Sequence, residues 1–179
     1  MTRLFVAIDP PPSHRLQIKS ICRGLPGARW IKPEQIHLTL RFIGEVDGNL
    51  FRQIIDELAA IKTEPLTLKI KGIGHFPPRR SPRVIWLGLE QNDSLVQLRN
   101  RIERSLTLIG LKAEGRKFAA HITIARLKNT PINKIKDFLA ANYHYELPPF
   151  KVKEFNLFSS TLNSSGATHQ IEASYPLKI

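Results

Sequence analysis

The sequence predicts a single α+β domain over residues 1–179, built from two pseudo-symmetric lobes that each hold an antiparallel sheet and helices, with a cleft between them. Two observations predict this class. Short apolar runs that alternate like strands are separated by segments whose apolar residues recur at helical spacing. The same order of elements then occurs twice, and nothing between the two copies has the composition of a linker.

Local signals divide the first half into five elements. Three consecutive prolines from Pro10 end the first apolar run, and Ser13 after them can cap a helix. Later, Gly44 and Gly48 bound a loop between an alternating stretch and the next helical pattern. The expected elements are a strand over 4–8, a helix over 13–24, a strand over 36–43, a helix that ends near 61 and a strand over 65–73.

The second half repeats this order and adds one strand. Asp93 or Ser94 can cap its first helix, and Pro131 stands near the start of its second. The expected elements are a strand over 84–89, a helix over 93–109, a strand over 120–126, a helix that begins near 131, a strand over 149–158 and an edge strand over 169–177.

The two halves also share residues in register. An offset of 84 residues takes His37 to His121. At the same offset Thr39 matches Thr123, Pro65 matches Pro149 and Lys69 matches Lys153. Two related lobes of strand–helix–strand–helix–strand explain this pattern, and a chance match of common residues is the alternative.

The chain is strongly basic, with 27 Lys and Arg against 15 Asp and Glu and a net charge of +12. This favours a polyanionic partner such as nucleic acid, an acidic membrane face or a phosphorylated small molecule, and a solvated basic surface is the alternative. No apolar run is long enough for a signal sequence or a membrane span. Because Cys22 has no partner for a disulfide, we expect a cytoplasmic protein, and we expect a monomer without an obligatory protein partner.

Each histidine of the matched pair opens a His-x-Thr pattern on a predicted strand. Side chains at i and i+2 of a strand point to the same face, so His37 projects with Thr39, and His121 with Thr123. These polar pairs must face water or a cleft, because burying them unpaired would be costly. If the lobes are related by an approximate two-fold axis, the two pairs face each other across a space the size of an anion.

Two imidazoles that flank one anion suit phosphodiester hydrolysis by in-line attack. One can activate water while the other protonates the leaving oxygen, since an unperturbed pKa of about 6.5 allows both protonation states near neutral pH. Threonine hydroxyls can donate to the non-bridging oxygens. We expect no metal or cofactor, because two distant histidines without a neighbouring Asp, Glu or Cys form a poor zinc site. The alternative is that both histidines only satisfy hydrogen bonds of the core.

These motifs and their flanks resemble the 2H phosphoesterases, and among them the bacterial and archaeal RNA 2′,3′-cyclic phosphodiesterases, formerly called 2′-5′ RNA ligases. The resemblance covers nearly the whole chain. It is carried by Arg3–Ile8, Trp30–Glu34, His37–Val46, Ile85–Leu89 and His121–Arg126. Many members have a proline directly before the second histidine, where this chain has Ala120. This difference removes no functional group from the site.

The resemblance implies that the chain hydrolyses a 2′,3′-cyclic phosphate at an RNA end to a 2′-phosphate, with slow 2′-5′ ligation as the reverse chemistry in some members. It implies that His37 protonates the departing 3′ oxygen and that His121 activates the water. It further implies that Thr39 and Thr123 hold the phosphate. Arg126 occupies the place of an arginine that often lies near the phosphate in the family.

Other residues leave alternatives open. Arg41, at i+4 from His37, falls on the His–Thr face of an ideal strand, where it either binds phosphate or lies at the cleft rim. Phe42 falls on the opposite face, where core packing is favoured over base stacking. The basic, proline-rich loop over 79–83 either contacts an RNA backbone or is solvated. His169 and three further histidines lack a threonine at i+2 and are expected to be structural or exposed.

Two other functions are compatible with the sequence. One is an RNA-end binding module with vestigial catalysis, which would bind tightly and in a salt-sensitive manner without converting its ligand. The other is a phosphodiesterase for small cyclic nucleotides. The net charge of +12 favours a longer polyanion over this second alternative.

Overall fold

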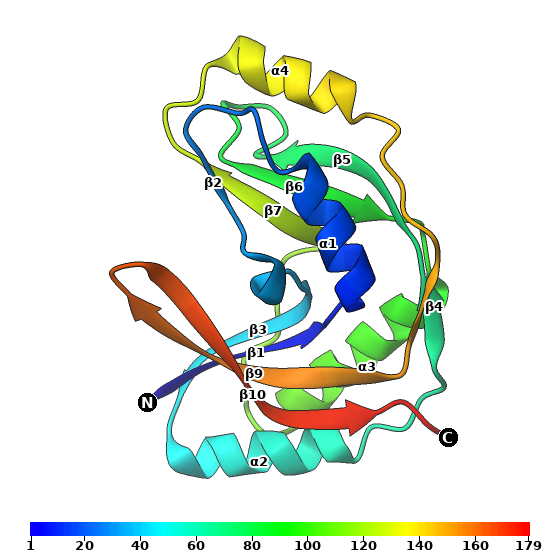
Figure 1. The fold of residues 1–179 in the computed structure, drawn as a ribbon. Coiled ribbons are helices and arrows are strands. Elements are labelled where there is room, and N and C mark those ends of the chain that lie inside the picture. Colours follow the sequence, from blue (N-terminus) through cyan, green and yellow to red (C-terminus); the bar gives the residue numbers. More distant parts are fainter.

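The computed structural model describes residues 1–179 and confirms the α+β class, with four helices and two four-stranded antiparallel sheets (Figure 1). The first sheet, called sheet A, has the order β10-β9-β1-β3 and contains β1 (Thr2–Ile8), β3 (Leu38–Val46), β9 (Glu154–Asn163) and β10 (Gly166–Pro176). The second, sheet B, has the order β2-β7-β6-β5 and contains β2 (Ala28–Trp30), β5 (Ile70–Phe76), β6 (Val84–Leu89) and β7 (His121–Leu127). A short ladder joins β4 (Leu66–Leu68) to β8 (Phe150–Val152).

Neither sheet is built from one half of the chain, which corrects the expectation of two consecutive lobes. The strands β9 and β10 of the second half extend sheet A beside β1, whereas β2 and β5 of the first half complete sheet B. The segments that lead into β5 and β9 run side by side between the sheets as the β4–β8 ladder (Figure 1). Each predicted long strand, over 65–73 and over 149–158, is therefore two strands. Because each sheet contains strands of both halves, the two halves of the chain cannot separate without loss of sheet pairing.

The helices begin close to the signals the sequence carries, but two expected caps are wrong. Ser13 does not cap the first helix, which begins one residue earlier, at Pro12, and has no side-chain cap. The helices are α1 (Pro12–Ile21), α2 (Gly48–Ala59), α3 (Asp93–Leu108) and α4 (Ile132–Ala141), and a 3-10 turn, η1, covers Pro33–Gln35. The side chain of Asp47 caps α2 by accepting from the Leu50 N–H. Asn92, and not Asp93 or Ser94, caps α3 by the same bond to the Leu95 N–H. The helices α2 and α3 contact each other and sheet A, and α4 packs on β2.

The apolar core continues through both sheets. One cluster of 32 buried residues includes strands of sheets A and B. A smaller cluster of Phe5, Ala7 and Phe158 lies on the other face of sheet A. No helix combines the length and the apolar character that crossing a membrane would require.

A β-bulge interrupts β3 soon after its histidine. Thr39 is opposite Ala7 of β1, and Arg41 is opposite Val6, so Leu40 has no partner residue. An extra residue of this kind reverses the alternation of side chains beyond it. The strand therefore turns Arg41 inward, where ideal alternation would turn it outward.

The same bulge occurs in β7. Thr123 is opposite Trp86 of β6, and Ala125 is opposite Ile85, so Ile124 has no partner residue. The bulges stand at matching places of the internal repeat. In both strands the fifth residue after the histidine, and not the fourth, therefore returns to the histidine's face.

Candidate active site

His37 lies directly before β3, held by one hydrogen bond and by aromatic packing. Its Nδ1 is 2.7 Å from the carbonyl oxygen of Gln35. Its ring centroid is 4.9 Å from that of Phe5, in the small apolar cluster of sheet A. The ring of His169 on β10 meets it edge-on at 5.3 Å. The ring is thus fixed on the face that sheet A turns away from the main core.

His121 is the first residue of β7 and is held in the same way. Its Nδ1 is 2.7 Å from the carbonyl oxygen of Ala119. The ring of Phe76 meets it edge-on, with centroids 4.9 Å apart, and the Trp86 ring lies 6.4 Å away. Both histidines therefore use the carbonyl two residues earlier, at matching positions of the repeat.

This shared bond determines which ring nitrogen faces a ligand. A carbonyl only accepts, so each Nδ1 must carry the hydrogen that bonds to Gln35 or Ala119. Nε2 is then the nitrogen left free on both His37 and His121. In the neutral ring it accepts a proton, and in the charged ring it donates one. The pair therefore has the groups that acid–base chemistry on a bound ester needs.

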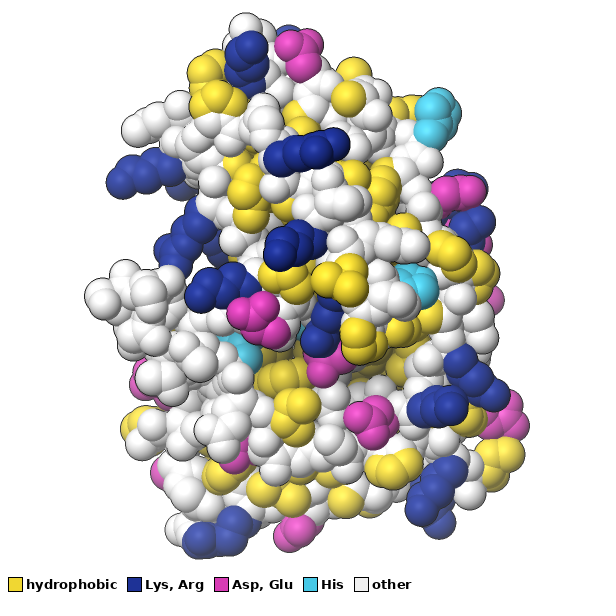
Figure 2. Space-filling view, viewed as in Figure 1, with side chains coloured by type: hydrophobic (Ala, Val, Ile, Leu, Met, Phe, Trp, Pro, Cys, Tyr) yellow, Lys and Arg dark blue, Asp and Glu magenta, His cyan; other side chains and the backbone are white.

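The two strands that carry the motifs meet where the sheets meet. The strands β3 and β7 contact each other, although they belong to different sheets. A notch opens between the upper lobe, with Lys and Arg side chains at its edge, and the β9–β10 hairpin below (Figure 2). Thr39 and Thr123 are half-buried, and each follows its histidine by two residues. Because both threonines precede the bulge of their strand, each lies on the same face as its histidine.

The electrostatic surroundings of His37 favour its neutral form. Burial is the main cause that lowers the pKa of His37 to about 4, and the bond to Gln35 opposes this shift. The charges of His169, Arg15 and Arg126 lower this pKa further. Arg126 is on β7, so its charge acts on His37 across the junction of the two sheets.

The profile described as LigT like Phosphoesterase matches the chain twice, over residues 8–86 and over 87–168. The chain belongs to the LigT-like phosphoesterase family. The double match also agrees with the internal repeat that takes His37 to His121.

Individual relatives of the family match most of the chain. The RNA 2′,3′-cyclic phosphodiesterase of Thermotoga maritima is 34% identical over 177 residues, which cover 94% of this chain and 92% of that protein. The protein of the same name from Archaeoglobus fulgidus is 30% identical over 171 residues, 94% of this chain and 96% of that one. The crystal structure of E. coli LigT in apo form has a TM-score of 0.82 and 25% identity, covering 99% of this chain and 98% of that chain.

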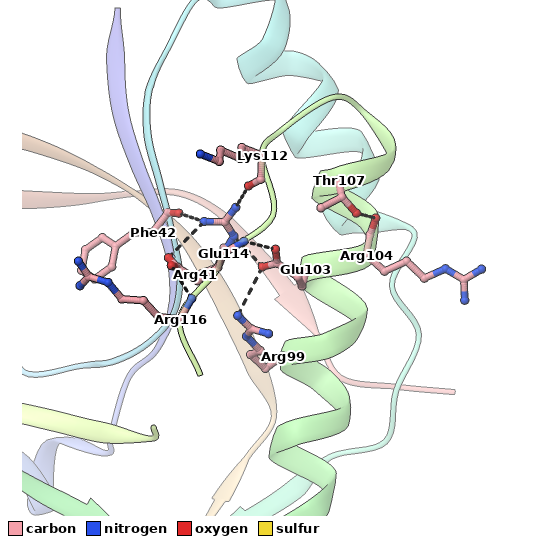
Figure 3. Close-up of polar contacts among 9 residues, drawn as sticks. All are labelled: Arg41, Phe42, Arg99, Glu103, Arg104, Thr107, Lys112, Glu114 and Arg116. Atoms are coloured by element: carbon pink, nitrogen blue, oxygen red, sulfur yellow. Dashed lines mark hydrogen bonds and ion pairs between the residues drawn. The ribbon is translucent and has the colours of Figure 1, made fainter. Parts of the chain in front are cut away.

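Within this LigT-like fold, Arg41 is not in the cleft, which corrects the expectation that it shares the face of His37. The bulge turns it inward, where its Nε lies 2.7 Å from Oε2 of Glu103 and its Nη1 lies 3.7 Å from Oε2 of Glu114 (Figure 3). The guanidinium also donates to the carbonyls of Phe42 and Lys112. Arg41 therefore ties β3 to α3 and to the segment after it, and its guanidinium is buried among these partners.

The same bulge reverses the expectation for Phe42. Its side chain is 58% exposed and its ring lies 6.0 Å from that of Phe5, on the side of His37. Arg126, the matching residue of the repeat, is likewise exposed. The internal repeat, which matches Phe42 to Arg126, is the only signal in the sequence that could have indicated this placement, because a bulge leaves no other mark there.

His169 is the residue of this site that local sequence signals miss. On sequence alone it is expected to be structural or exposed, whereas its ring packs against those of His37 and Phe5. It lies opposite Ser160 in the β9–β10 ladder. This position depends on the pairing of β9 with β1, which joins the two ends of the chain.

Proposed function

We propose that this chain hydrolyses the 2′,3′-cyclic phosphate at the end of an RNA to a 2′-phosphomonoester, with His37 and His121 as its acid–base pair. The observation that carries the proposal is the equivalence of the two histidines: each Nδ1 is engaged by the carbonyl two residues earlier, and each Nε2 is free. The relatives from Thermotoga maritima and Archaeoglobus fulgidus, both named RNA 2′,3′-cyclic phosphodiesterase, support the choice of substrate.

In the proposed reaction, water attacks phosphorus opposite the 3′ oxygen. His121 Nε2 takes a proton from the water as the new P–O bond forms, and His37 Nε2 gives a proton to the 3′ oxygen as the P–O3′ bond breaks. One water is consumed, and the 2′ ester bond is kept. Thr39 and Thr123 donate to the non-bridging oxygens, and Arg126 neutralises charge that builds on them. If a 5′-hydroxyl of another RNA attacks the same phosphorus in place of water, the P–O3′ bond breaks in the same way and a 2′-5′ linkage forms.

The direction of proton transfer has a testable consequence. Because the pKa of His37 is about 4, the ring is neutral in the free protein at neutral pH. It must gain a proton before it can act as the acid, and the negative charge of a bound phosphodiester favours that gain. We therefore expect proton uptake when the chain binds a substrate analogue, measured by calorimetry in buffers of different ionisation enthalpy. Binding without proton uptake would instead assign His37 as the base.

The function itself is tested with an oligonucleotide that ends in a 2′,3′-cyclic phosphate, incubated with the chain in EDTA. The proposal predicts a 2′-phosphate product, which is distinguished from a 3′-phosphate by chromatography against both standards. A 3′-phosphate product would contradict the assigned leaving group. Tight binding without any product would favour the RNA-end binding module. We place the reaction in the cytoplasm, a setting suited to the free thiol of Cys22.

A further inference from the structure

One end of sheet B carries basic side chains that the proposed reaction does not use. Three segments meet there, residues 24–31, 76–83 and 126–131, and they contain six Lys and Arg residues but no Asp or Glu. We call these six the basic rim: Arg29, Arg79, Arg80, Arg83, Arg126 and Lys128. All six are exposed.

Strand pairing brings the segments of the basic rim together. Arg29 of β2 lies opposite Arg126 of β7, and Val84, which follows Arg83, lies opposite Arg126 on the other side. The Leu127 N–H donates to the carbonyl oxygen of Arg83 at 2.8 Å. The loop over 77–83 and the end of β7 therefore form one continuous edge.

The charge of the basic rim is not neutralised within the protein. Arg15, Arg41, Arg99, Lys69 and Lys71 form ion pairs with carboxylates, but no residue of the rim does. The only side-chain bond from the rim runs from Arg29 Nη2 to the carbonyl oxygen of Ser165, at 2.7 Å. An uncompensated row of exposed arginines and lysines attracts polyanions.

The basic rim begins at the reaction site. Arg126, whose charge acts on His37, also lines a cavity of about 580 Å³ together with Arg29 and Lys128. The opposite side of the notch is the β9–β10 hairpin, and residues 156–171 of this hairpin include no Lys or Arg. An RNA whose 3′ end occupies the site has only one strand leading away, and the basic rim offers this strand positive charge that residues 156–171 do not.

We propose that the basic rim binds the backbone phosphates of the nucleotides that precede the cyclic end, so that an RNA oligomer is preferred over a cyclic mononucleotide. This inference rests on the proposed function, because the strand must leave from the same site. Contacts of this kind add affinity without reading sequence, and they weaken as salt is raised.

The test compares two triple variants of equal charge change. The rim variant combines Arg79→Ala, Arg80→Ala and Lys128→Ala, which spares Arg126. The control combines Arg52→Ala, Arg104→Ala and Lys178→Ala, exposed residues of α2, α3 and the C-terminal segment. For each protein, kcat/KM is measured with a 2′,3′-cyclic mononucleotide and with an eight-nucleotide RNA that ends in the same group.

We expect the ratio of oligomer to mononucleotide kcat/KM to fall about 10-fold or more in the rim variant, and to stay at the wild-type value in the control. The plot of log affinity against log salt, measured with a 2′-phosphate oligomer, should lose about 0.7 of slope for each phosphate contact removed. An unchanged ratio and slope in the rim variant, or an equal fall in the control, would overturn the inference.

A binding measurement separates this inference from the proposed function. If the wild-type chain hydrolyses neither substrate, the proposed function fails, and the affinity of the 2′-phosphate oligomer still decides the inference. Weaker binding in the rim variant alone then supports it, and equal binding in all three proteins overturns it. Binding to vesicles of anionic phospholipid is measured for the same three proteins. If the rim variant binds vesicles more weakly but binds the oligomer as wild type does, the partner of the basic rim is a membrane surface and not RNA.

Discussion

Replacing Arg41 by alanine should destabilise the protein while leaving its chemistry intact. The side chain of Arg41 is 8% exposed and that of Glu103 is 15% exposed, so their ion pair is largely out of water. Breaking such a pair from one side costs about 3–5 kcal/mol. Glu103 retains Arg99 at 3.6 Å and the Glu114 N–H at 2.7 Å, which favours the lower end of this range.

A loss of about 3 kcal/mol should lower the Tm of a chain of this size by roughly 6–12 °C. Thermal and urea unfolding measure this loss, and kcat/KM per folded molecule should stay within about 3-fold of wild type because Arg41 does not face the cleft. Arg41→Lys, which keeps the charge but loses the planar fork, should lie between wild type and Arg41→Ala in stability. A large fall in kcat/KM of Arg41→Ala with unchanged Tm would refute the buried placement.

Three further predictions concern the site itself. The free energy of unfolding should decrease by up to about 3 kcal/mol as pH falls from 6.5 towards 4, because His37 takes up a proton in the unfolded chain but not in the folded protein, where its pKa is about 4. Urea unfolding at a series of pH values measures this decrease, which should be smaller in His37→Gln. His169→Gln should raise the pKa of His37, since it removes a charge that lowers it, and an NMR titration that leaves this pKa unmoved would contradict the assigned cause. Phe42→Ala should raise KM about 5- to 100-fold for RNA if the exposed ring stacks on a base, with unfolding unchanged, and an unchanged KM would rule out stacking.

The elements and the histidine pair could be predicted because their signals are local. Alternation at His37–Thr39 and His121–Thr123 places each pair on one face, and the intervals up to each bulge are short enough for ideal geometry to hold. Proline and glycine likewise mark most ends of helices and strands. Two caps were wrong: Asn92 stands beside the two residues that compete with it, and Ser13 lies inside α1, which begins at Pro12 without a side-chain cap.

What the sequence could not predict depends on pairing between distant residues. The placement of Arg41 and Phe42 depends on how β3 meets β1, because the bulge exists only in that pairing. The exchange of β5 and β9 between lobes is also invisible locally, since either sheet could accept either strand. His169 reaches His37 only as a result of that exchange.

The most direct test of the two-histidine site is the single-turnover rate on an oligonucleotide with a 2′,3′-cyclic phosphate end, measured in EDTA for wild type, His37→Ala and His121→Ala. Each substitution should reduce the rate about 10²–10⁴-fold or more, since each removes one member of an acid–base pair. Circular dichroism confirms that each variant is folded. Full activity in either variant, or activity of the wild type only when a metal ion is added back, would contradict the proposed mechanism.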